Sequence, residues 1–250
     1  MTHRDLPDHA QSFLAGRSLI FLATDKQAPP MPWSMINSAP PKGRIRQRLL
    51  PLNQYKAADR RRNRRLYGVD SIDLFPTMLV MHFTVIPKAE DVMKIFLRPS
   101  DLIVGNQDPE RSLVSVHYMV DVDGTVMQLA REDRITSGTY GVDHLTLAIE
   151  MVAKDEADLK SRPIQLLAAF HLADTLTKRH NIPPWRVFSH EEVAFGKFFM
   201  ADYTDLADTE YPYFYPKDSF RYDPGTDVMA WCREFLFRQR GLWEQHPASR

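Results

Sequence analysis

One nearly uninterrupted apolar run, Thr77-Met-Leu-Val-Met-His-Phe-Thr-Val85, constrains the fold of this chain more than any other segment. Apolar runs of this kind are typical of β-strands buried on both faces, as in parallel sheets that are covered by helices. His82 lies inside the run, and burying its ring without a polar partner would cost roughly 1–3 kcal/mol. The segment therefore predicts a central strand that carries one histidine with a partner.

From about residue 74 onward, segments of strand type alternate with segments of helix type. The Asp-Gly pair that ends at Gly124 separates two β-rich runs and is a hairpin signal. Pro163 suits the start of a helix, where its missing N–H is not needed. We expect strands at 77–85, 114–120, 125–129, 145–152 and 185–188, and helices at 89–97, 163–179 and from after Gly225 to about Arg240. This alternation predicts the α/β class: a single domain with a central mixed β-sheet flanked by helices.

The first 70 residues differ from the rest, because they are rich in proline and poor in periodicity. We interpret residues 1–70 as an irregular N-terminal extension that wraps the domain or stays partly mobile, and residues 71–245 as the main domain. Residues 56–65 read KAADRRRNRR, which favours a solvated, charged helix face. Binding of a polyanion is the alternative, but no aromatic residues interleave with the basic ones, so no nucleic-acid partner is expected.

Composition narrows the possible functions. Lys+Arg and Asp+Glu number 32 each in the 250 residues, so the formal net charge is zero and indicates neither nucleic acid nor a membrane surface as partner. Cys232 is the single cysteine, which excludes an intramolecular disulfide and a cysteine-rich zinc module. A bound metal would need histidine and carboxylate ligands. No apolar run is long enough to predict a transmembrane segment.

Two of the nine histidines stand out by position. His82 lies within the central apolar run, and His190 directly follows the strand expected at 185–188. The ends of strands are where α/β domains build their sites. Spacing alone does not link these two histidines to one metal, because they lie far apart in the sequence.

Five short segments occur in a fixed order: Met81-His-Phe-Thr84; Val114-Ser-Val-His-Tyr118 with Val122-Asp-Gly-Thr-Val126; Leu145-Thr-Leu-Ala-Ile-Glu150; Val187-Phe-Ser-His190 with Val193-Ala and Gly196-Lys197; and Arg221-Tyr-Asp-Pro-Gly225. In this order they resemble the type 2 N-acetylmuramoyl-L-alanine amidases, relatives of phage T7 lysozyme and of animal peptidoglycan recognition proteins. Each pattern is weak alone, but they occur together in this order, and the resemblance covers roughly residues 74–240.

The resemblance implies a zinc site of two histidines and one carboxylate or cysteine, with one Zn²⁺ per chain. These positions fall on His82, His190 and Asp223. Asp202 and Asp205 are alternative ligands, because the interval between His190 and Asp223 is longer than in the family. We prefer Asp223 as the ligand, because Pro-Gly and a helix follow it, as they follow the ligand position in the family. Zn²⁺ favours such nitrogen and oxygen ligands in a tetrahedron and leaves one position open in catalytic sites.

The resemblance also implies catalytic residues. Glu150 matches the carboxylate that takes a proton from the attacking water and delivers it to the leaving amine. A strand-end carboxylate paired with a cation is the alternative. Some relatives use a tyrosine at the position of Val116, so this chain resembles the members that use glutamate. Arg221 stands where the family usually has lysine and would stabilise an oxyanion, and Lys197 is the competing cation.

Two segments depart from the family pattern. The interval 198–222 is rich in aromatic residues and forms either a wall of the substrate cleft or a packed loop. Ile135-Thr-Ser-Gly138 replaces the family's Trp-His-Ala-Gly, so a substrate-contacting histidine is missing and the substrate-binding residues stay unknown. His117 fits a structural place or one beside a metal ligand.

The resemblance therefore predicts a zinc-dependent amidase that cuts the bond between N-acetylmuramic acid and L-alanine in peptidoglycan or muropeptides. A non-catalytic peptidoglycan-binding module of the same fold is the alternative. Localisation and oligomeric state stay open. The apolar stretch 18–23 is shorter than the core of a secretory signal, so we expect a strand or packing segment there. If this stretch is a degenerate export signal, we expect the protein in the cell envelope or periplasm. If it is not, we expect the protein in the cytoplasm.

Overall fold

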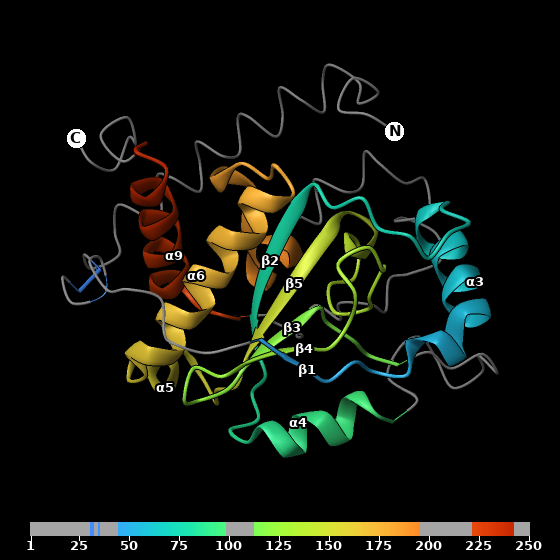
Figure 1. The fold of residues 1–250 in the computed structure, drawn as a ribbon, viewed down its shortest axis with the longest axis horizontal. Coiled ribbons are helices and arrows are strands. Elements are labelled where there is room, and N and C mark those ends of the chain that lie inside the picture. The colour runs from blue at the N-terminus through green and yellow to red at the C-terminus, as the bar shows by residue number, and fades with distance from the viewer. Residues whose placement is uncertain (1–30, 33–34, 36–44, 99–112, 196–221, 243–250) are drawn as a thin grey trace.

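The computed structural model describes residues 31–32, 35, 45–98, 113–195 and 222–242. At its centre lies a mixed six-stranded sheet in the order β1-β4-β3-β5-β2-β6 (Figure 1). The strands are β1 (Arg46–Gln47), β2 (Met78–Phe83), β3 (Tyr118–Val120), β4 (Val126–Gln128), β5 (Thr146–Met151) and β6 (Val187–Ser189). β2 pairs in parallel with β5 and β6, and β3 pairs in parallel with β5. β4 is antiparallel to β3 and parallel to β1.

Helices cover the sheet. They are α3 (Lys56–Tyr67), α4 (Ala89–Phe96), α5 (Glu156–Lys160), α6 (Pro163–Arg179), α7 (His190–Phe195) and α9 (Thr226–Gln239), with 3-10 turns η2 (Leu52–Tyr55), η4 (Asp143–Leu145) and η5 (Pro184–Arg186). The predicted α/β class, with a central mixed sheet flanked by helices, is confirmed. Within the described residues, no helix is both long and apolar enough to cross a bilayer.

Alternate residues of β2 and β5 face two different cores. Leu79 and Met81 join Leu147 and Ile149 in a core that α6 and α9 cover. The other face of β5 joins the core under η2 and α4, which includes Ala148. β2 is therefore buried on both sides, as its apolar run predicts. His82 lies in this strand and is 2% exposed, so the structure must supply its polar partners.

The strand expected at 114–120 is shorter in the structure, where only Tyr118–Val120 is extended in the sheet. The carbonyls of Ser115 and His117 accept hydrogen bonds from Ser137 and Leu129 instead of continuing a regular ladder. His117 has a structural place. Its Nε2 lies 2.9 Å from the Arg134 carbonyl, and its Nδ1 accepts from the Ala148 N–H.

The described part of the N-terminal segment wraps the domain. β1 adds an edge strand, and Leu50 and Leu52 enter the core that α4 covers. The boundary between extension and domain at residue 70 stays a prediction, and the apolar stretch 18–23 lies outside the described residues.

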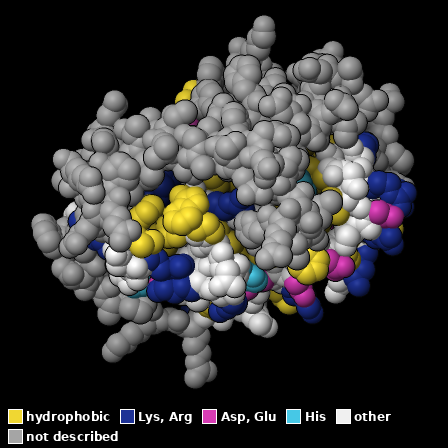
Figure 2. All heavy atoms as spheres, turned by 90° about the horizontal axis from the view of Figure 1, so that it is seen from above, with side chains coloured by type: hydrophobic (Ala, Val, Ile, Leu, Met, Phe, Trp, Pro, Cys, Tyr) yellow, Lys and Arg dark blue, Asp and Glu magenta, His cyan; other side chains and the backbone are white. Residues whose placement is uncertain are grey.

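The basic run 56–65 forms most of α3, and the two faces of this helix differ. On the outer face, Arg60 and Arg64 pair with Asp70. Figure 2 shows Lys and Arg side chains gathered with acidic ones at the margin of the molecule where α3 lies. On the inner face, Asp59 and Arg62 are buried. The expected charged helix face is therefore only one side of α3.

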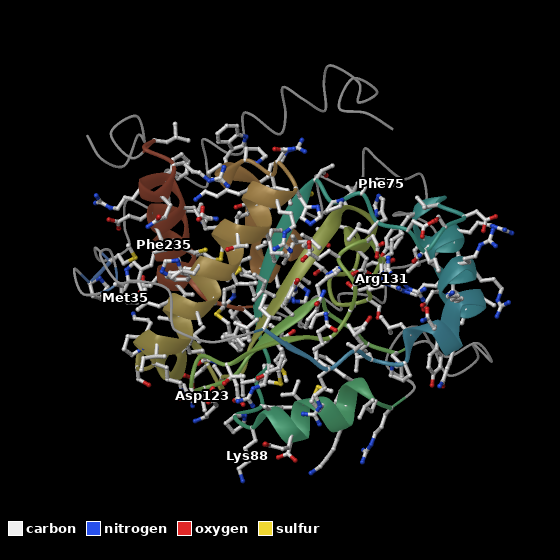
Figure 3. The ribbon with its side chains drawn as sticks, in the orientation of Figure 1. Met35, Phe75, Lys88, Asp123, Arg131 and Phe235 are labelled. Carbon is white, nitrogen blue, oxygen red and sulfur yellow. The ribbon has the colours of Figure 1, made fainter. Side chains whose placement is uncertain are left out.

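An aromatic pair joins the two long helices on one face of the sheet. Phe170 of α6 and Phe235 of α9 have ring centroids 5.9 Å apart, and both side chains are almost completely buried. Figure 3 shows Phe235 on α9, far from Phe75, which lies on the other side of the sheet. Phe75 is 80% exposed.

We expect Phe170→Ala to lower the free energy of unfolding by about 3–5 kcal/mol, because it removes a buried ring and leaves a cavity. Phe75→Ala is the matched control, and its effect should stay within about 0.5 kcal/mol. Urea denaturation of the two variants and the wild type measures both values. Equal losses in the two variants would contradict the assignment of Phe170 to the core.

Candidate metal centre

Three side chains from distant parts of the sequence meet at the carboxyl edge of the sheet. His82 lies one residue before the end of β2, His190 begins α7 directly after β6, and Asp223 precedes α9. The Nδ1 atoms of the two histidines lie 3.1 Å apart, and each lies 3.1 Å from Oδ2 of Asp223. All three side chains are buried. Within the described part of the chain, no other group of three histidine, cysteine or acidic side chains has this arrangement.

The spacing of these three atoms fits one metal ion. In a tetrahedral zinc site with ligands at about 2.0–2.1 Å, neighbouring ligand atoms lie roughly 3.3 Å apart. Hydrogen bonds alone explain poorly why these two nitrogens and one oxygen lie so close together. Both Nδ1 atoms would have to carry a proton to donate to the same Asp223 oxygen, although the two nitrogens lie only 3.1 Å apart. His82, His190 and Asp223 would hold the metal that the sequence resemblance implies, and a fourth position would remain for water or substrate.

The charge state of Asp223 suits this role. Burial opposes its ionisation, but hydrogen bonds from His190 and His82 outweigh burial and hold the pKa of the carboxyl group below its usual range. A carboxylate that is ionised at neutral pH is the form that binds a cation.

The backbone that carries His190 is fixed by a cap at the start of α7. Ser189 Oγ accepts from the Glu192 N–H, and Glu192 Oε2 accepts from the Ser189 N–H, each at 2.8 Å. This reciprocal pair is a capping box. Arg233 of α9 binds the same Glu192 carboxylate at 2.8 Å and also donates to the Val187 carbonyl. The helix that follows Asp223 is thereby joined to the helix that begins with His190.

The Asp-Pro-Gly segment brings Asp223 to the cluster. Gly225 has φ +99°, and a Cβ built there would lie 2.1 Å from the Glu156 side chain. The Glu156 carboxylate accepts from the N–H groups of Asp227 and Val228, at 2.8 and 3.1 Å, and so caps α9. Glycine is needed at this position because the cap from α5 occupies the space of a side chain.

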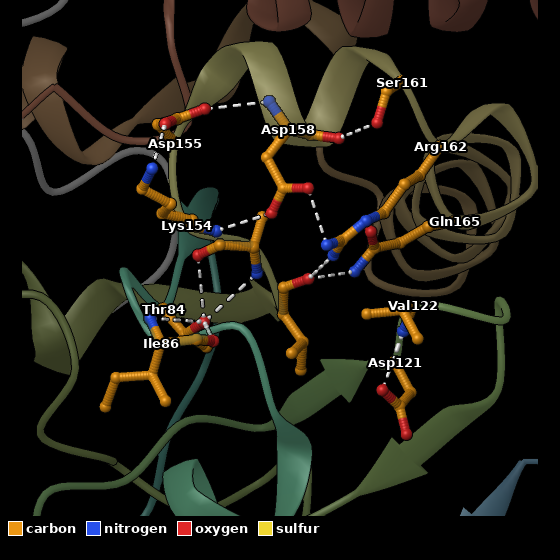
Figure 4. A network of polar contacts seen from close by, with 12 residues as sticks. Thr84, Ile86, Asp121, Val122, Lys154, Asp155, Asp158, Ser161, Arg162 and Gln165 are labelled. Atoms are coloured by element: carbon orange, nitrogen blue, oxygen red, sulfur yellow. Dashed lines mark hydrogen bonds and ion pairs between the residues drawn. The ribbon is translucent and has the colours of Figure 1, made fainter.

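The strand ends that carry His82 and Glu150 are tied together by polar contacts (Figure 4). Thr84 Oγ1 accepts from the Ala153 N–H at 3.2 Å and donates to the Ile86 carbonyl at 2.6 Å. Arg162 and Gln165 of the α6 region donate to the Val152 carbonyl, at 2.7 and 2.9 Å. Thr84 of the His-x-Thr motif therefore joins the ends of β2 and β5.

Glu150 lies beside the cluster in the sheet. It is the register partner of His82 in the parallel pair β2–β5, so both side chains project from the same face. Its side chain is half-buried. This placement suits a carboxylate that reaches both the cluster and solvent, and its catalytic role stays a prediction.

Arg221, Lys197, Asp202, Asp205 and most of the aromatic interval 198–222 lie outside the described residues. Their roles stay predictions.

Several residues around the cluster were not predicted from the sequence. The capping box Ser189-His-Glu-Glu192 has a sequence signature that could have been found. Thr139 Oγ1 lies 2.9 Å from His82 Nε2, and Thr139 follows directly after the segment in which the chain departs from the family. No local pattern marks this contact.

The fold and the site define a class: an α/β protein whose candidate metal ligands cluster at the carboxyl edge of a mixed sheet. The model of the N-acetylmuramoyl-L-alanine amidase family matches residues 73–205, which is more than half of the chain. The chain belongs to this family of hydrolases, as the order of its motifs predicts. The match includes His82, Glu150 and His190 and ends before Asp223, whose place beside the histidines comes from the structure.

Solved structures resemble this chain at low identity. The N-acetylmuramoyl-L-alanine amidase LysC from Clostridium intestinale URNW is 20% identical over 48% of this chain and 73% of its own, with a TM-score of 0.36. PlyL is 17% identical over 60% of this chain and 83% of its own, with a TM-score of 0.43. The Staphylococcus aureus hydrolase AmiA, solved in complex with its ligand, is 16% identical over 86% and 95%, with a TM-score of 0.48. No curated protein sequence matches significantly.

We expect Gly225→Ala to destabilise the protein by about 3 kcal/mol or more, because backbone strain adds to the collision with Glu156. Gly68→Ala is the control. Gly68 also has a positive φ, +66°, but a Cβ there would meet no atom within 4 Å. Its substitution should cost only the strain, about 1–2 kcal/mol. Urea denaturation compares the two, and equal losses would contradict the close approach of Glu156.

The buried ring of His117 gives a pH dependence. Burial lowers its pKa from 6.5 to about 4, so between these values the unfolded chain binds a proton that the folded chain does not. The stabilisation is present above pH 6.5 and is lost as the pH falls toward 4, by roughly 3 kcal/mol. His117→Asn should flatten this part of the profile of unfolding free energy against pH. The contribution of His144, whose pKa burial also lowers to about 4, should remain. An unchanged slope would contradict the prediction.

Proposed function

We propose that this chain is a zinc-dependent N-acetylmuramoyl-L-alanine amidase. It hydrolyses the amide bond between N-acetylmuramic acid and L-alanine in peptidoglycan or muropeptides. Membership of the amidase family supports the reaction. The observation that carries the zinc dependence is the triangle of two imidazole nitrogens and one carboxylate oxygen, with all three sides 3.1 Å long.

In this proposal His82, His190 and Asp223 hold one Zn²⁺. When bound, the ion lowers the pKa of a coordinated water to about 7 and polarises a carbonyl as a Lewis acid. The protein supplies the rest. Two neutral imidazoles and one ionised carboxylate leave a single net positive charge in the site, which attracts the carbonyl oxygen of the substrate.

Glu150 is the proposed general base and acid. It takes a proton as the water oxygen forms its bond to the amide carbon, and it returns the proton to the alanine nitrogen as the carbon–nitrogen bond breaks. Arg221 is the proposed cation that stabilises the oxyanion, and Lys197 is the alternative. The same-face register of Glu150 with His82 supports the role of Glu150.

A module of the same fold that binds wall fragments without cutting them is the second candidate. The cluster of all three candidate ligands favours the enzyme, because binding of a glycopeptide alone needs no such cluster. The two candidates differ in their products.

Glu150→Gln should lower kcat on a defined muropeptide by about 10²- to 10⁴-fold and leave the zinc content unchanged, because it removes the base and keeps the ligands. Glu90→Gln on the exposed side of α4 is the matched control and should keep wild-type activity. Mass spectrometry of the released stem peptide, together with metal analysis, measures both. A chelator should abolish wild-type activity, and added zinc should restore it.

Full activity of the Glu150→Gln variant would exclude this residue as the base. Tight binding of muropeptide by the zinc-loaded wild type without any product would favour the binding module.

A further inference from the structure

A buried cation from the basic run reaches toward the metal centre. Arg62 of α3 is 8% exposed, although it lies in the run that reads as a solvated surface. Its guanidinium pairs with Asp143 and also donates to the Thr136 carbonyl at 3.3 Å. Tyr67, at the end of the same helix, donates to the same Asp143 oxygen at 2.8 Å. One carboxylate thus receives two donors from α3.

The other oxygen of Asp143 holds the segment next to His82. Its Oδ1 accepts from the Thr139 N–H at 2.6 Å. The Val142 N–H closes the turn on the Thr139 carbonyl at 3.2 Å. Thr139 is completely buried, and its Oγ1 lies 2.9 Å from His82 Nε2. A continuous path of contacts therefore runs from Arg62 through Asp143 and Thr139 to His82.

The contact with Thr139 suits the tautomer of His82 that a metal at Nδ1 requires. Nδ1 can bind a metal only through its lone pair, so the proton must be on Nε2. Nε2–H then donates to Thr139 Oγ1, and this bond fixes the plane of the ring. Loss of a partner that holds the second nitrogen of a ligand histidine typically lowers metal affinity by roughly 10- to 100-fold.

We infer that Arg62, Asp143 and Thr139 are positioning residues for His82, which hold the orientation of its ring and thereby raise the affinity of the His82–His190–Asp223 cluster for metal. This inference rests on the proposed function, because it requires that the cluster bind a metal. It also gives α3 a part in the site, although the helix lies before residue 71, the predicted start of the main domain.

A second buried ion pair of α3 provides a matched control. Arg134 pairs with Asp59 of α3 and donates to the Leu52 carbonyl at 3.1 Å. Its side chain is as buried as that of Arg62, at 8% exposure each. In both arginines Nε has no hydrogen-bond partner. The side chain of Arg134 thus contacts the N-terminal segment. The backbone carbonyl of Arg134 contacts the ring of His117 rather than that of His82.

The test compares Arg62→Met, Arg134→Met, Thr139→Val and Thr139→Ser in the full chain. Zinc affinity is measured by competition with a chromophoric chelator, and the visible spectrum of the Co²⁺-loaded protein reports ligand geometry. Urea denaturation of each metal-free variant gives its stability. We expect Arg62→Met and Thr139→Val to lower zinc affinity about 10- to 100-fold. Arg134→Met should lose similar stability but keep wild-type affinity. Thr139→Ser, which retains the hydroxyl group, should keep most of the affinity and the wild-type cobalt spectrum.

Equal zinc affinities of the Arg62→Met and Arg134→Met variants would overturn the inference, whether both match the wild type or both are reduced. If Arg62→Met fails to fold, the comparison of Thr139→Val with Thr139→Ser is the test. Equal zinc affinities of these two variants would overturn the inference. A wild-type protein that binds no zinc would refute the proposed function and this inference with it. If the wild type binds zinc and all variants bind it with the same affinity, the inference is refuted and the proposed function is not.

Discussion

The parallel pairing of β2 with its two neighbours is the constraint on which the site depends. β5 and β6 lie on either side of β2 and run parallel to it, so the carboxyl ends of the three strands meet at one edge of the sheet. His82, Glu150 and His190 lie at or directly after these three ends. Side chains alternate between the two faces of a strand, so a slip of one residue in β2 would turn His82 into the core that α6 and α9 cover. The apolar residues of β2 therefore fix the place of its one histidine.

The polar groups of the site are stable in a buried position because each has an assigned partner. His82 contacts Thr139 on one side and Asp223 on the other. The burial of Asp223 is offset by the two histidines. Without such partners, burial would raise the pKa of the carboxyl group and favour its uncharged form. Capping contacts around Ser189 and Glu156 then hold the two helices that begin at the cluster.

The sequence predicts much of the fold because the regular elements leave local signals. Pro163–Arg179 forms α6 with the expected bounds, and the Asp-Gly hairpin lies between β3 and β4. The strand at 114–120 is too long in the prediction, because its first carbonyls bond to a loop that no periodicity reveals. The three candidate ligands came from the resemblance to a family, and the structure brings them together. The path through Asp143 and Arg62 could not be predicted, because its contacts from Arg62 to Asp143 and from Thr139 to His82 join residues 81 and 57 positions apart.

The distances in sequence between the members of the cluster have a consequence for biosynthesis. His82 and His190 are 108 positions apart, and His82 and Asp223 are 141 positions apart. Domains emerge from the ribosome in order, at about 5–20 residues per second. A nascent chain that ends before Asp223 has both imidazoles but lacks the carboxylate. The complete set of candidate ligands therefore exists only after Asp223 has been translated and α9 has docked, and until then the growing chain is kept from assembling its centre.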